Sequence, residues 1–129
     1  MANYYGKGRT NRFRVKDYAA IEEAAKPFGS VLPWTDGTVV VQAGNDEGDF
    51  THYDEDTDTE SALGDILCDH LAEGEVAVMM SVGSQKLCYL AGWATAYHSS
   101  GETVEVNLNE IYALAQEIFP DATITEAVS

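Results

Sequence analysis

The sequence predicts a single α+β domain over residues 1–129, with a mainly antiparallel sheet and helices on one face. Its 129 residues suffice for one hydrophobic core, and 45% of them are apolar. Strand-like and helix-like patterns follow one another in the order β-α-β-β-α-β-β-β-α. Turns of hairpin length join most of the strands, and connections this short require antiparallel neighbours. The tail from about residue 122 is expected to fray.

The first part of the chain predicts a strand, a helix and a hairpin. Residues 11–16 alternate apolar and basic side chains, as in a strand with one face toward solvent. Asp17 then caps a helix that ends near residue 28. Two further strands flank Asp36-Gly37, a pair that favours a type I′ turn because both central residues need a positive φ. The core side of the helix comprises Tyr18, Ile21, Ala25 and Phe28.

The middle of the chain predicts an acidic connection followed by a second helix. Residues 44–58 are rich in loop-forming side chains and leave room for a short strand around Phe50–Tyr53. Thr57–Glu60 has the form of a capping box, which marks the start of a helix, and Gly74 ends that helix. The apolar stripe of this helix comprises Leu63, Ile66, Leu67, His70 and Leu71.

The remainder predicts three strands and a final helix. Residues 75–82 are almost continuously apolar, which indicates a central strand covered on both faces. Residues 86–98 form a long strand, and residues 103–108 form the last one. The final helix spans residues 110–119, and Pro120 ends it. The side chains of the last strand expected to point inward are Val104, Val106 and Leu108.

The charge of the chain is large and unevenly distributed. The formal net charge is −15, although residues 1–26 alone carry a net charge of +3. Residues 27–129 contain one base, Lys86, and nineteen acids. Solubility of a small domain needs a net charge of only about 2–8. Phosphate repulsion opposes direct binding of nucleic acid by this part, whereas a partner with a positive groove would be attracted to it.

The sequence indicates a cytoplasmic protein of a bacterial host cell. No apolar run reaches the roughly 18 residues of a membrane-spanning helix, and the N-terminus lacks the apolar segment of a signal peptide. Cys68 and Cys88 are therefore expected to be reduced and to serve as small core residues. No membrane partner is expected.

Two segments resemble a family of small acidic proteins encoded on phages, plasmids and integrative elements. They are YYGKGRTNRFRVKD, residues 4–17, and GEVAVMMSVGSQKLCYLAGWATA, residues 74–96. The resemblance implies an accessory protein of a mobile element, a class that includes inhibitors of host defence. It carries no functional residues over to this chain.

A concentration of carboxylates in residues 46–60 is the main candidate for a binding site. These fifteen residues contain eight acids and no base. A run of charge is usually a solvated face, but this density exceeds what solubility requires. Presented along a strand or on successive helical turns, such acids can match the spacing of nucleic-acid phosphates. The acids are Asp46, Glu47, Asp49, Asp54, Glu55, Asp56, Asp58 and Glu60.

Neither a dedicated metal site nor a catalytic motif is expected. Four acids spaced two apart, from Asp54 to Glu60, resemble the early ligands of a calcium loop. However, Thr59 stands where that loop needs glycine, and Asp65 is too short to replace the usual bidentate glutamate. A weak divalent site stays open. The histidines and cysteines lack zinc spacing, and Gly6–Thr10 lacks a phosphate loop's full glycine spacing, so it is expected to be a flexible basic turn.

An aromatic stripe on the long strand has more than one interpretation. Tyr89, Trp93 and Tyr97 share a face. If the opposite face takes the helices, the stripe is exposed and can contact a partner, because Trp and Tyr dominate interface hot spots. Alternatively it packs as core under Trp34, Phe50 and the acidic loop, since large exposed apolar patches are uncommon on monomers. A homodimer face is a third interpretation.

The leading hypothesis is a non-enzymatic inhibitor of a host nucleic-acid-directed defence complex, of the anti-CRISPR or antirestriction type. The eight acids would act as phosphate surrogates in a basic groove, and Tyr53 and Trp93 would supply apolar contacts. No cofactor is expected. One alternative is a small-molecule or cation-binding module formed by the aromatic face and the acidic loop. Another is an interaction subunit whose basic strand meets an acidic partner or the acidic face of a second copy.

Overall fold

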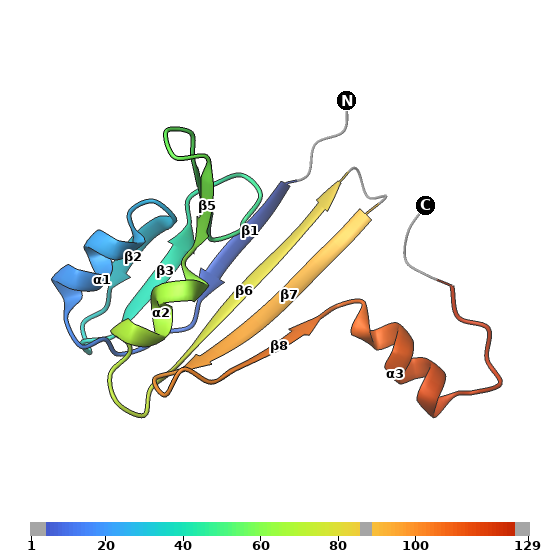
Figure 1. Ribbon diagram of the computed structural model, residues 1–129. Coiled ribbons are helices and arrows are strands. Elements are labelled where there is room, and N and C mark those ends of the chain that lie inside the picture. Colours follow the sequence, from blue (N-terminus) through green and yellow to red (C-terminus); the bar gives the residue numbers. More distant parts are fainter. Residues whose placement is uncertain (1–4, 86–88, 126–129) are drawn as a thin grey trace.

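A computed structural model describes residues 5–85 and 89–125 and confirms the α+β class (Figure 1). Its main sheet has six strands, and every neighbouring pair is antiparallel. In spatial order the strands are β2 (Gly29–Pro33), β3 (Val39–Ala43), β1 (Tyr5–Thr10), β6 (Val76–Gln85), β7 (Tyr89–His98) and β8 (Thr103–Asn107). The other elements are the hairpin β4 (Thr51–Asp54) and β5 (Thr59–Ala62), and the helices α1 (Tyr18–Ala25), α2 (Gly64–His70) and α3 (Glu110–Ile118).

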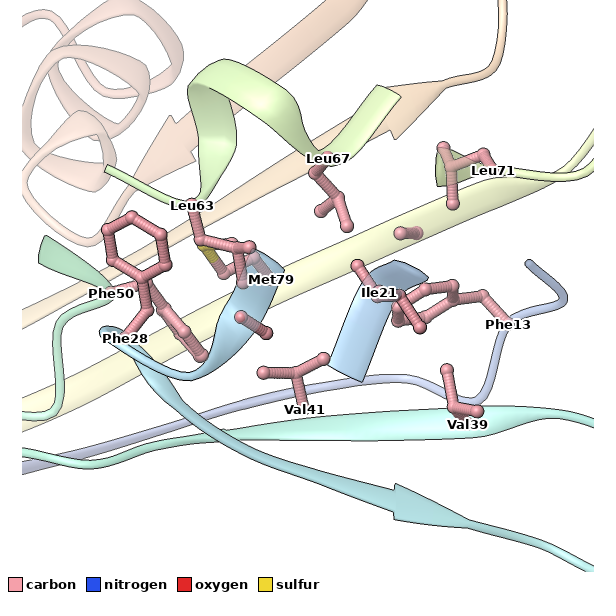
Figure 2. Packing of buried hydrophobic residues seen from close by; sticks show 12 residues of the cluster. Phe13, Ile21, Phe28, Val39, Val41, Phe50, Leu63, Leu67, Leu71 and Met79 are labelled. Atoms are coloured by element: carbon pink, nitrogen blue, oxygen red, sulfur yellow. The ribbon is translucent and has the colours of Figure 1, made fainter. Parts of the chain in front are cut away.

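The hydrophobic core lies between one face of the sheet and the helices α1 and α2 (Figure 2). Leu63, Leu67 and Leu71, four residues apart on and beside α2, are fully buried, as the helical spacing in the sequence predicts. Ile21 and Ala25 of α1 are buried with them. Tyr18 was predicted on this side of α1 but is exposed, and its hydroxyl donates to Glu22 at 3.0 Å.

The first strand lies earlier in the chain than the sequence predicts. Residues 5–10 form β1, which lies between β3 and β6, whereas residues 6–10 were expected to be a flexible turn. Phe13 and Val15, expected in a strand, form only isolated bridges to Val39 and Leu71. The prediction was wrong because the glycines at positions 6 and 8 serve a different purpose: they let another segment of backbone cross β1 at close range.

The acidic connection folds as a hairpin where a helix start was predicted. Residues 57–60 have the pattern of a capping box, yet Thr59 and Glu60 belong to β5 and pair with Asp54 and Tyr53 of β4. Asp58 has a φ of 52°, a left-handed conformation that no helix N-terminus uses. Helix α2 begins only at Gly64. The expected short strand around Phe50–Tyr53 is present as β4.

The second face of the sheet is uncovered over β6, β7 and β8. Because Ala77 and Met79 point into the core, the alternating residues Met80 and Val82 point away from it, and they are 55% and 59% exposed. The prediction that β6 is covered on both faces is therefore wrong for the isolated chain. The predicted inward orientation of three residues is wrong too, since all three are exposed: Val104, Val106 and Leu108.

Helix α3 stands apart from the domain. It extends past the end of β8 and away from the sheet (Figure 1), and none of its residues is buried. It begins at the predicted residue and ends one residue earlier than predicted, at Ile118. Asn109 occupies the N-cap position but makes no side-chain capping hydrogen bond. Both α1 and α2 cover the core face as predicted, whereas α3 covers neither face of its own sheet.

Candidate acidic binding site

The β4–β5 hairpin projects from the domain and carries acids at its tip (Figure 1). Its two strands pair only with each other, from Thr51 opposite Ala62 to Asp54 opposite Thr59. The turn between them is formed by residues 55–58, so that three acids lie at the end of the hairpin and a fourth lies on its second strand. The exposed acids are Glu55, Asp56, Asp58 and Glu60.

Local hydrogen bonds hold this turn. The Asp56 N–H donates to Asp54 Oδ1 at 2.9 Å, and the Tyr53 hydroxyl donates to Asp58 Oδ1. This second bond raises the pKa of Tyr53, because ionisation of the phenol would remove the donated proton. The bonds occupy one carboxylate oxygen each of Asp54 and Asp58 and connect the turn to β4.

The loop before the hairpin is also held by its own side chains. Asn45 Oδ1 accepts from the backbone N–H groups of Glu47 and Asp49, each at 3.2 Å. Asp49 Oδ1 accepts from the Thr51 hydroxyl at 2.9 Å. The Gly6 N–H donates to the Asp46 carbonyl at 2.7 Å, which fixes the loop to β1. Asp49 therefore has a structural role, whereas the Asp46 and Glu47 side chains are exposed to solvent.

The charge of these two segments is not neutralised within the described part of the chain. The two ion pairs there, Arg12 with Asp36 and Lys26 with Glu23, involve none of the acids in residues 46–60. The predicted acids thus lie on one loop and the hairpin that directly follows it. Their surplus negative charge is available to a cation or a basic partner.

The two predicted aromatic contacts lie in different clefts. Tyr53, 52% exposed, lines a cleft of about 380 Å³ between the hairpin and the segment around Phe28 and Gly29. Trp93 is partly buried on the core side of β7 and lines a second cleft of about 350 Å³. Thr51 of β4 borders both clefts. The structure therefore brings the acids together but separates Tyr53 from Trp93.

The cleft beside Trp93 combines aromatic and acidic side chains. Tyr97 lines it together with the carboxyl-bearing residues Asp49, Asp65 and Glu105. Burial raises the pKa of Tyr97, and the negative charges of Glu105 and Asp65 raise it further. An anionic cleft with aromatic walls suits an organic cation such as an arginine, lysine or polyamine group.

Glu105 was not predicted as a site residue. The alternation in residues 103–107 places it on the opposite face of β8 from Val104 and Val106, and it pairs with Thr95 on the core side. Because Val104 and Val106 were predicted to point inward, Glu105 was assigned to the outward face of β8. Tyr89, the third member of the predicted stripe, has a side chain that lies outside the described residues, as does Cys88.

No three His, Cys, Asp or Glu side chains in residues 5–85 and 89–125 are placed to hold a metal ion together. Burial raises the pKa of Cys68, and the nearby charge of Asp69 adds to this effect, so its reactive thiolate form is disfavoured. His98 Nδ1 is engaged by Ser100 Oγ at 2.8 Å. None of the described helices combines the length and apolar character needed to cross a bilayer.

Comparison with known proteins adds no relative. The chain matches no family model, no curated protein and no solved structure.

Proposed function

We propose that this protein is a non-enzymatic inhibitor that occupies the basic nucleic-acid-binding groove of a host defence complex, of the anti-CRISPR or antirestriction type. The observation that supports this most is the set of carboxylates on a projecting hairpin and the loop before it that form no ion pair with residues 5–85 or 89–125. A protrusion can enter a groove that a flat face cannot. The proposal places the protein in the cytoplasm of a bacterial host cell.

The physical mechanism is competitive exclusion. Long-range attraction between the acidic hairpin and a basic groove speeds their encounter, as phosphate charge does for nucleic acid. Contacts with Tyr53 at the hairpin and with the walls of the Trp93 cleft would slow release, because a desolvated aromatic contact must be broken before dissociation. An arginine or lysine of the partner is the side chain best suited to that cleft.

A charge-matched pair of variants tests the proposal. The hairpin variant carries Glu55→Gln, Asp56→Asn and Glu60→Gln, and the control variant carries Glu22→Gln, Glu102→Gln and Asp121→Asn. All six side chains are exposed, and both variants change the net charge equally. DNA cleavage by a panel of purified RNA-guided and restriction nucleases is measured at low salt with increasing inhibitor.

The hairpin variant should inhibit about 3-fold to 150-fold less well, since three exposed charge contacts at about 0.2–1 kcal/mol each contribute about 0.6–3 kcal/mol. The control variant should inhibit like the wild type. Equal inhibition by both variants would show that the position of the acids is irrelevant. A wild-type protein that inhibits no nuclease in the panel would remove the proposed class of target.

A second candidate function has its own observation. The cleft with Trp93, Tyr97 and the three carboxyl-bearing residues favours an organic cation as a direct ligand. Spermidine, arginine and choline are suitable probes, with thermal stability and the fluorescence of Trp93 in a Trp34→Phe background as readouts. A saturable change in the wild type that Glu105→Gln weakens would support a small-molecule site. No change with any probe would favour the inhibitor.

A further inference from the structure

Two apolar surfaces are left without a partner in the described chain. The first, here called the open face, is the sheet face opposite the core over β1, β6, β7 and β8. Its exposed apolar side chains are Met80, Val82, Leu90, Val104 and Val106. Monomers rarely expose so much contiguous apolar surface, and such patches usually mark interfaces. The nearly continuous apolar sequence of β6 likewise indicates a strand covered on both faces.

The second surface is the apolar side of α3. Ile111, Leu114 and Ile118 follow helical spacing, and all are more than half exposed, Ile118 to 68%. Helices shorter than about 12–15 residues are marginal in water unless they pack on something. This helix has nine residues, buries none of them and lacks a side-chain cap. It therefore needs a surface on which to pack.

The open face is hollowed where a helix could lie. Lys7, Arg9, Met80 and Val82 line a groove of about 700 Å³ along β1 and β6. Met80 and Val82 also line a smaller apolar hollow of about 210 Å³ that extends to Gly92 and β8. The two depressions lie on either side of Met80 and Val82, which line both of them.

Charge favours α3 as the occupant. Lys7 pairs with Val82 and Arg9 with Met80 across the β1–β6 ladder, so both basic side chains lie on the open face. The sequence of α3 contains Glu110 and Glu117 and no base. Because most of the chain is strongly acidic, two copies repel one another elsewhere. Lys7 and Arg9 outnumber Asp46, the one acid lining the groove, so the groove offers an acidic helix a net positive surface.

We propose that α3 of one copy packs on the open face of a second copy, and that the same contact occurs reciprocally, giving a two-fold symmetric dimer. The link between β8 and α3 favours packing of α3 on a second copy over packing of α3 on the open face of its own chain. Leu108 N–H continues the ladder by donating to the Gly92 carbonyl at 2.9 Å, and α3 then leaves past the end of β8 (Figure 1). Asp46 of the acidic loop borders the groove, whereas the β4–β5 hairpin adjoins the core face and stays free, so the inference does not depend on the proposed function of the hairpin.

Sedimentation velocity of the full chain tests the dimer. The wild type should sediment with twice the 14.0 kDa mass of one chain at micromolar concentration. Val82→Glu and Ile118→Glu should each shift it to monomer without loss of cooperative melting, because both side chains are exposed within one chain. Ala20→Glu, an equally acidic change at an exposed position of α1 on the core side of the sheet, should leave the dimer intact.

Mixing the Val82→Glu and Ile118→Glu variants distinguishes packing of α3 on a second copy from packing of α3 within its own chain. The Val82→Glu chain keeps an intact α3, and the Ile118→Glu chain keeps an intact open face, so an equimolar mixture should form a heterodimer through one intact contact. Lys7→Glu with Arg9→Glu should weaken the dimer, and adding Glu110→Lys with Glu117→Lys should restore it. The proposal would be overturned by a monomeric wild type, or by a mixture of the two variants that stays monomeric. It would also be overturned if the four-fold charge reversal failed to restore the dimer.

Discussion

Gly8 of β1 and Gly48 of the acidic loop are in such close contact that a methyl group on Gly8 would overlap the Gly48 carbonyl oxygen. Gly6 stands in the same relation to the Glu47 carbonyl. Gly48 itself has a φ of 74°, which favours glycine. The acidic loop thus depends on glycines in two segments about forty residues apart for its position on β1.

Gly8→Ala should destabilise the protein. In an unconstrained strand this change is favourable by roughly 0.5–1 kcal/mol, because alanine loses less conformational freedom on folding. Here the added methyl group forces two backbones apart, and overpacking of this kind costs about 1–3 kcal/mol. Denaturant unfolding should therefore show a lower midpoint, with Ser30→Ala on exposed β2 as the control. An unchanged or higher midpoint would mean that the loop does not cross β1 at this point.

Leu67→Ala should remove a large part of the stability of the fold. The side chain is fully buried between α2 and the sheet, and truncation of a buried leucine costs about 2–5 kcal/mol. The same change at Leu32, which is 40% exposed, should cost only about 1 kcal/mol. Urea unfolding of both variants measures the difference. Equal losses would contradict the position of α2 on the core.

The Tyr53 hydroxyl should ionise at a higher pH than the ordinary value of about 10. The hydrogen bond to Asp58 raises its pKa, so folding favours the neutral phenol. Its contribution to stability is fully present below the unfolded pKa and is lost as the pH rises through the folded pKa. Asp58→Asn should lower the pKa of Tyr53, because the phenolate would no longer face a carboxylate.

Ultraviolet titration of phenolate formation checks this prediction. The Tyr53→Phe variant identifies the step that belongs to Tyr53 among the seven tyrosines. If Asp58→Asn leaves that step in place, the hairpin turn lacks this hydrogen bond in solution.

The existence of the helices could be predicted from their apolar spacing, although α2 ends at His70, before the predicted stop at Gly74. Ile21, Ala25, Leu67 and Leu71 follow this spacing. The hairpin could not be predicted, because the capping-box pattern at residues 57–60 also fits a turn followed by a strand. Residues 57–60 form a hairpin and not a helix start because β4 pairs with β5 and Asp58 has a positive φ.

The candidate site was predictable in composition but not in arrangement. Charge density identified the acids, since eight of them occur in residues 46–60. No local pattern shows that Tyr53 and Trp93 would lie in different clefts or that Glu105 would face Trp93 and Tyr97. These relations follow from strand order and register, which bring together residues distant in sequence.

Direct competition with DNA tests the central claim, namely that the acidic hairpin occupies a basic groove. Fluorescence anisotropy of labelled duplex DNA bound to an inhibited nuclease is measured with increasing inhibitor. The apparent Kd of the DNA should rise in proportion to inhibitor concentration, and the effect should weaken between about 50 and 200 mM salt. If the DNA stays bound while the inhibitor also binds, or if salt has no effect, the claim is contradicted.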